Sequence, residues 1–157
     1  REYVRLTQEL DARDTPVVLV LFGDHKPWMG NGGSVYEEMG IDFDTSTLAG
    51  FRNYYATPYL IWANRAAKEV LGADFTGDGG DFSPCFLMTR LFDACGWAGP
   101  GYMQLSRAMR DISPLLHTNG LFLHDGVLTS VLSDTDRSFY RSWLAVQYYR
   151  EHVAAYS

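Results

Sequence analysis

The sequence has few cysteines, no excess of positive charge and no long apolar run. Two cysteines among 157 residues are too few for the disulfide framework of a small secreted domain. Lys and Arg total 13 against 19 Asp and Glu, a net charge of −6. This balance argues against non-specific binding to nucleic acid or to an anionic membrane surface, because both require a basic face. Apolar stretches such as 16–23 and 57–63 are too short to span a bilayer, and the mixed-charge N-terminal segment lacks the pattern of a secretory signal.

Apolar and aromatic residues, by contrast, are abundant, at 46% and 15% of the chain. They exclude general disorder, and the length suits one domain with a core of its own. Neither an internal repeat nor a low-complexity linker divides the sequence. We therefore expect one α/β unit over residues 1–157.

The spacing of apolar residues predicts both helices and strands. Helices are predicted over 1–13, 84–95, 102–112 and from Ser133 onward, and strands over 17–22 and 54–63. A hairpin of short strands is predicted around Asp125-Gly126. Residues 30–48 and 72–81 are predicted loops, the first with one short helical turn. Ser83 and Ser133 are predicted to cap the helices that follow them.

The apolar run 17–22 is continuous rather than alternating, which is typical of a strand covered on both faces in a parallel sheet. The predicted fold class is therefore α/β, with a parallel central strand, flanking helices and a small C-terminal hairpin.

Asp24 and His25 follow that strand directly, after Gly23. Ligands of open α/β sheets collect at the carboxyl ends of strands, and Gly23 allows the backbone to leave the strand there. A carboxylate oxygen and an imidazole nitrogen suit a divalent ion such as Mn²⁺, Zn²⁺ or Mg²⁺. The pair is thus a candidate metal site, and a turn-forming Asp followed by a surface His is the alternative interpretation.

Three segments carry a resemblance to known proteins. Residues 23–27 read Gly-Asp-His-Lys-Pro, residues 55–64 read Tyr-Ala-Thr-Pro-Tyr-Leu-Ile-Trp-Ala-Asn, and the predicted Ser83-Pro84 helix ends in Ala94-Cys95-Gly96. Together they resemble the lipoteichoic acid synthase and phosphoglycerol transferase family, sulfatase-like proteins of the alkaline phosphatase superfamily. The first segment is similar to the family's Gly-Asp-His-x-Pro motif, and the second to its Thr-Pro-containing strand that ends in Asn. The resemblance is close over about the first hundred residues and loose beyond them.

The resemblance implies a metal-dependent enzyme with an alkaline-phosphatase-like fold, anchored in a bacterial membrane with its catalytic domain on the extracytoplasmic side. Asp24 and His25 would correspond to two ligands of its Mn²⁺, Zn²⁺ or Mg²⁺ ion. The family's nucleophilic Thr, a further acidic ligand and the substrate-binding His and Arg groups lie upstream of this point, and none of those motifs occurs here. The chain, which starts at Arg1, is therefore expected to be the C-terminal part of the catalytic domain. By itself it is expected to be soluble and inactive, with the upstream half of the domain as its partner.

The chemistry that the resemblance implies is metal-assisted transfer from phosphate or sulfate esters of the cell envelope, including lipid-linked ones. A covalent intermediate on the Thr would pass its group to an alcohol or to water. Lys26 is a candidate contact for the anionic substrate, although a solvated lysine is the simpler interpretation. Trp28 is a candidate wall of the substrate cleft, because it lies so close to Asp24 and His25 in the sequence.

Other patterns favour structural interpretations. Asp74, Asp78 and Asp81 lack the spacing and the closing Glu of an EF-hand, so a solvated turn is favoured. His124-Asp125 is favoured as part of a hairpin turn. Cys85 and Cys95 fit no Cys-x-Pro-x-Arg sulfatase motif, and both are predicted to be buried free thiols. Ten residues along one helix would separate them by about 15 Å, beyond the limit of about 7 Å for a disulfide.

A second functional hypothesis comes from another class of protein. The chain would be a stand-alone α/β binding or interaction module, in which Asp24 and His25 are structural. The coding sequence upstream of Arg1 distinguishes the two hypotheses. Transmembrane helices followed by a domain with a Thr nucleophile would favour the enzyme, and a nearby start codon would favour the module.

Overall fold

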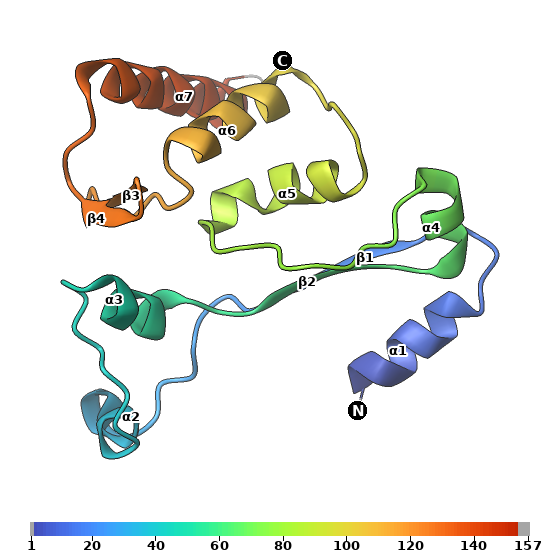
Figure 1. Ribbon diagram of the computed structural model, residues 1–157, viewed down its shortest axis with the longest axis horizontal. Coiled ribbons are helices and arrows are strands. Elements are labelled where there is room, and N and C mark those ends of the chain that lie inside the picture. The colour runs from blue at the N-terminus through green and yellow to red at the C-terminus, as the bar shows by residue number, and fades with distance from the viewer. Residues whose placement is uncertain (1, 154–157) are drawn as a thin grey trace. The chain divides into compact units, whose positions relative to one another are not determined.

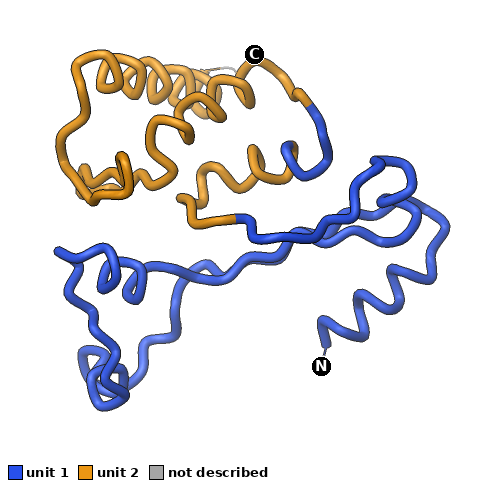
Figure 2. Tube along the Cα trace, viewed as in Figure 1, with its two compact units in different colours: residues 1–79, 93–97 blue, residues 80–92, 98–157 orange. Residues whose placement is uncertain are grey.

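The computed structural model describes residues 2–153, which form two compact units (Figures 1 and 2). Unit 1 comprises the residues up to Gly79 together with Asp93–Trp97, and unit 2 comprises Gly80–Phe92 and the residues from Ala98 on. The fold is mixed α/β, about 49% helix with two small antiparallel hairpins. This confirms the mixed class, while the expectation of one α/β unit over 1–157 stays a prediction. Within residues 2–153, no helix combines the length and the apolar composition needed to cross a membrane.

Unit 1 is built around a two-stranded antiparallel ladder. β1 (Val18–Phe22) pairs with β2 (Tyr59–Ala63), in a register that runs from Val18 opposite Ala63 to Phe22 opposite Tyr59. The helices of the unit are α1 (Glu2–Asp11), the 3-10 turn η1 (Asn31–Gly33), α2 (Ser34–Glu38), α3 (Leu48–Tyr55) and α4 (Arg65–Leu71).

β1 departs from the prediction in two respects. It pairs with an antiparallel neighbour, so the parallel central strand is not confirmed among the described residues. The run is also less covered than expected, because its first four residues are half-buried and Phe22 is 61% exposed. A continuous apolar run indicates that a strand suits burial, but it specifies neither the direction of the neighbouring strand nor the layers that cover it.

The predicted strand 54–63 and the predicted loop 30–48 were partly wrong. Tyr54 and Tyr55 end helix α3, and the strand begins only at Tyr59. The helix is capped by Thr47, whose hydroxyl accepts a hydrogen bond from the Gly50 N–H at 3.0 Å. η1 and α2 span residues 31–38, the first half of the predicted loop, which is more than the one short helical turn expected there. Tyr54 and Tyr55 have a high strand propensity, which favoured a strand in the prediction. In the structure, the helix that Thr47 caps extends through both residues.

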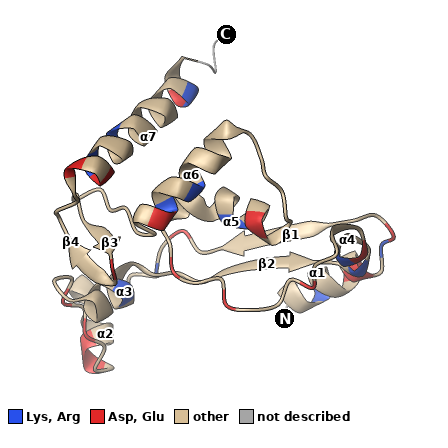
Figure 3. Cartoon of the chain, turned by 45° about the horizontal axis from the view of Figure 1, so that its top comes forward, with Lys and Arg blue, Asp and Glu red and all other residues tan. Residues whose placement is uncertain are grey.

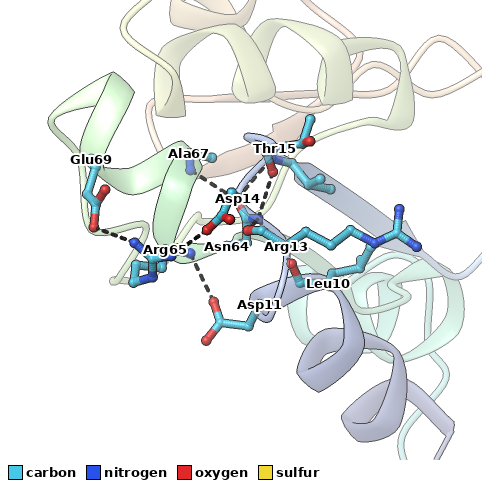
Figure 4. A network of polar contacts seen from close by, with 10 residues as sticks. Leu10, Asp11, Arg13, Asp14, Thr15, Asn64, Arg65, Ala67 and Glu69 are labelled. Atoms are coloured by element: carbon cyan, nitrogen blue, oxygen red, sulfur yellow. Dashed lines mark hydrogen bonds and ion pairs between the residues drawn. The ribbon is translucent and has the colours of Figure 1, made fainter.

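Asn64 joins the segments at one end of the ladder (Figure 4). Its side chain is fully buried at 0% exposure. The amide oxygen accepts hydrogen bonds from the Val17 N–H and the Ala67 N–H, each at 2.9 Å. The amide nitrogen donates to the carbonyl oxygens of Leu10, Arg13 and Thr15 at 3.0, 3.2 and 2.9 Å. One side chain thus ties the end of α1 and the start of β1 to the start of α4.

Unit 2 packs helices against a short hairpin. The 3-10 turn η2 (Pro84–Phe86) leads into α5 (Leu87–Ala94), and α6 (Gly101–Ile112), β3 (Phe122–His124), β4 (Val127–Thr129) and α7 (Asp134–His152) follow. The core consists of the buried Phe86, Met109 and Trp143. The Trp143 indole N–H donates to the Ser106 hydroxyl at 3.1 Å, so the one polar atom of this ring is satisfied inside the core.

More of the predictions for unit 2 than for unit 1 are confirmed. The hairpin around Asp125-Gly126 is confirmed, with Leu123 opposite Leu128. The Ser133 cap is also confirmed, since its hydroxyl accepts from the Asp136 N–H at 3.1 Å. Ser83 is the N-cap residue of η2 and Pro84 follows it, as predicted, but the Ser83 side chain makes no capping hydrogen bond. Its hydroxyl donates to the Leu116 carbonyl at 3.0 Å and accepts from the Leu116 N–H at 2.8 Å.

Both cysteines are free thiols, as predicted, and Cys95 is buried. The prediction that Cys85 is buried was wrong, because it lies exposed on η2 while its neighbour Phe86 takes the core position. Desolvation nevertheless raises the pKa of the Cys85 thiol to about 11. Cys85 is therefore accessible but carries little thiolate at neutral pH.

Replacing Asn64 tests the junction. We expect Asn64→Ala to lower the free energy of unfolding by about 3 kcal/mol or more, because it leaves buried backbone donors and acceptors without partners. Asn64→Asp should destabilise at least as much, since it turns a carboxylate oxygen toward three carbonyl oxygens. Arg65→Ala is the matched control, because its exposed ion pairs with Asp14 and Glu69 contribute about 1 kcal/mol or less. Urea unfolding measures all three, and Asn64→Ala within 1 kcal/mol of wild type would contradict this role.

Candidate functional site

Asp24 and His25 lie directly after β1, in unit 1, and both point into solvent. Their side chains are 81% and 78% exposed. The Asp24 Oδ2 and His25 Nε2 atoms are 3.5 Å apart, and Asp24 Oδ1 accepts a hydrogen bond from the His25 backbone N–H at 2.9 Å. The structure thus brings the two predicted metal ligands together at the strand end.

The His25 ring is oriented by a backbone carbonyl. Its Nδ1 lies 3.0 Å from the Lys26 carbonyl oxygen, which can only accept a hydrogen bond. In the tautomer that carries its proton on Nδ1, the ring donates to this carbonyl, and Nε2 is then the nitrogen that lies beside Asp24. Metal-binding histidines are held in the same way, through the nitrogen that does not bind the metal.

Gly23 and Thr57 fix the point where the chain leaves β1. The Gly23 N–H donates to the Pro58 carbonyl at 3.0 Å, and the Thr57 hydroxyl donates to the Gly23 carbonyl at 2.7 Å. A Cβ atom on residue 23 would lie 3.1 Å from the Thr57 Cβ. Gly23 is therefore favoured here by the close approach of Thr57, and not by a left-handed backbone.

A pocket of about 390 Å³ adjoins the pair, a size within the range of small-molecule sites. It is lined by Asp24, His25, Lys26, Pro27, Trp28, Tyr36, Phe43, Tyr54 and Tyr55. The predicted candidates Asp24, His25, Lys26 and Trp28 therefore share one cavity. The other aromatic residues were not foreseen, because the sequence placed them in a loop and in a strand.

Two side-chain contacts hold the loop that carries these residues. Lys26 is half-buried, and its ammonium group donates to the Asn53 carbonyl oxygen in α3. The buried Tyr36 donates its hydroxyl to the Pro27 carbonyl oxygen at 2.5 Å. Lys26 is thus tied to the protein rather than fully solvated, and it lies on the pocket wall.

The remaining sequence candidates form no comparable site. Among residues 2–153, no group of three or more His, Cys, Asp and Glu side chains is placed to hold a metal ion, and this includes Asp74, Asp78 and Asp81. His124 belongs to the hairpin of unit 2. A hydrogen bond with the Ile112 carbonyl, at 2.9 Å, is the main cause of its raised pKa, and its Nε2 lies 3.8 Å from Asp125 Oδ2.

Comparison of the chain with protein-family models, with curated proteins and with solved structures finds no match.

Removing the Tyr36 hydroxyl tests how the loop is held. We expect Tyr36→Phe to lower the free energy of unfolding by about 1 kcal/mol, because the Pro27 carbonyl loses its donor in a partly buried position. Tyr3→Phe is the matched control, since Tyr3 is 65% exposed and should change stability by less than about 0.5 kcal/mol. Urea unfolding of both variants checks the prediction, and equal effects of the two substitutions would contradict it.

Proposed function

We propose that this chain is the C-terminal part of the catalytic domain of a membrane-anchored, metal-dependent phosphoglycerol transferase or sulfatase-like hydrolase. Its substrates would be phosphate or sulfate esters of the cell envelope. The observation that carries the proposal is the Asp24–His25 pair at the end of β1. Two atoms that can bind a metal ion, Asp24 Oδ2 and His25 Nε2, lie exposed there and 3.5 Å apart. The Gly-Asp-His-Lys-Pro segment and its resemblance to that family support the same assignment.

The geometry of the pair fits a divalent ion. Ligand atoms about 2.1 Å from a tetrahedrally coordinated ion lie about 3.4 Å apart, close to the 3.5 Å between Asp24 Oδ2 and His25 Nε2. A carboxylate oxygen and an imidazole nitrogen suit Mn²⁺, Zn²⁺ or Mg²⁺. The further ligands would come from the upstream half of the domain, as the resemblance implies.

Each residue then has a defined task. A bound ion would supply charge stabilisation to the ester oxygen and lower the pKa of the attacking hydroxyl, which the upstream half provides. Asp24 would contribute its negative charge and one ligand oxygen. His25 would contribute Nε2, held in place through the Nδ1 contact with the Lys26 carbonyl. Lys26 and Trp28 would line the part of the cleft that receives the substrate.

Metal titration of this chain is the first test. We expect weak binding of Mn²⁺ and Zn²⁺, with dissociation constants of about 10⁻⁴ M or higher, because two ligands leave the ion largely hydrated. Isothermal titration calorimetry measures it, with His25→Ala as the control variant. Tight, stoichiometric binding that disappears in His25→Ala would show a complete site in this chain and would overturn the assignment to one half of a domain.

Substitution in the longer protein is the second test. We expect Asp24→Ala and His25→Ala each to lower kcat/KM for a phosphate or sulfate ester by at least about 100-fold and to reduce bound metal. Asp125→Asn is the matched control, because it changes another exposed acid beside a His and should leave both quantities unchanged. Wild-type activity and metal content in either site variant would remove the pair from the mechanism.

A further inference from the structure

Five aromatic side chains converge on the pocket beside Asp24 and His25. Trp28 and Tyr54 meet nearly at right angles, with ring centroids 6.3 Å apart and an interplanar angle of 72°. Tyr54 also contacts Phe43 at 5.5 Å and Tyr55 at 4.7 Å, and Phe43 contacts Tyr36 at 4.9 Å. The rings support one another, so their positions are fixed by mutual packing.

Trp28 is the least covered of these rings, at 62% exposure. A large indole that is held at the edge of a cavity and left open to water is available for a ligand. Trp28 and Tyr54 both line the pocket, so a compact group inside it can contact both rings. The electron-rich faces of Trp and Tyr attract cations, and recognition of quaternary ammonium groups is the characteristic use of such surfaces.

The charges around the pocket favour a cation. Asp24 lies on its wall with a carboxylate that is mostly exposed. α2, which contributes Tyr36 to the lining, also carries Glu37 and Glu38 and no basic residue (Figure 3). Lys26 also lines the pocket and keeps its positive charge, but its ammonium group donates to the Asn53 carbonyl in α3. An acidic surface of this kind raises the local concentration of cationic ligands.

We propose that this aromatic pocket binds a quaternary ammonium group, such as the trimethylammonium group of choline, against Trp28 and Tyr54. The binding stands on the pocket alone and needs no metal. Asp24 and His25 are part of the pocket wall, so an ester bound at that pair would place the quaternary ammonium group of its alcohol in the pocket. This assignment to the ester alcohol rests on the proposed function.

The test compares choline with 3,3-dimethylbutan-1-ol, which has the same shape and no charge. Each compound is titrated into the 157-residue chain in EDTA-containing buffer, with ionic strength matched by NaCl. The readouts are the upfield shift of the methyl proton signal, which aromatic ring currents produce, and the shift of the Trp28 indole N–H signal. We expect choline to bind at least ten-fold more tightly than its neutral analogue, because cation–π attraction acts on the charge.

Variants locate the site. Trp28→Leu should weaken choline binding at least ten-fold, whereas Trp28→Tyr should keep most of it, because a tyrosine face also attracts cations. Asp24→Asn should weaken binding of choline and leave that of dimethylbutanol unchanged. Trp97→Leu is the matched control, since Trp97 is another exposed tryptophan outside the pocket lining, and it should have no effect.

Three outcomes would overturn the inference. Equal affinity for choline and dimethylbutanol would show an apolar pocket without cation recognition. Binding that persists in Trp28→Leu would place the site elsewhere. No binding of choline up to about 50 mM, far above a dissociation constant of about 1 mM, would exclude the site. Because all measurements exclude free metal, a negative result leaves the metal assignment of Asp24 and His25 untouched, and a failed metal titration leaves this inference untouched.

Discussion

The buried amide of Asn64 is the interaction on which unit 1 depends. A two-stranded ladder is only marginally stable by itself, and none of the residues of β1 is fully buried. Packing alone therefore does not fix the position of this strand. Asn64 binds the Val17 N–H just before β1 and the Leu10, Arg13 and Thr15 carbonyls of the segment that leads into it. Since Gly23 and Thr57 hold the other end, the place of Asp24 and His25 follows from contacts at both ends of one short strand.

Two elements of unit 2 could be predicted because residues close together in the sequence determine them. Ser133 with Asp136 three residues later specifies the start of α7, and Asp125-Gly126 specifies the hairpin turn. α3 was missed because Tyr54 and Tyr55 have high strand propensity, although Thr47 offered a capping signal. The direction of the strand beside β1 could not be predicted, since it depends on pairing between residues about forty positions apart.

The candidate site shows the same division. Asp24 and His25 were predictable because they are adjacent and follow a strong apolar run. The aromatic wall was not, because Tyr36, Phe43 and Tyr54 come from three separate segments that meet only in the folded unit. Lys26 illustrates the limit most clearly. Its position beside the pair is visible in the sequence, whereas its bond with the Asn53 carbonyl depends on α3.

The two proposals place two positive charges close together, a divalent ion at Asp24 and His25 and a quaternary ammonium group beside Trp28. A divalent ion at Asp24 and His25 would repel a cation in the adjoining pocket, because like charges a few ångströms apart interact strongly outside bulk water. That repulsion is offset when an anionic group lies between them. A phosphate ester whose alcohol carries a quaternary ammonium group has this arrangement of charge, with the phosphate toward the donor pair and the cation toward Trp28. Taken together, the two proposals predict a zwitterionic ligand rather than a simple anion or a simple cation.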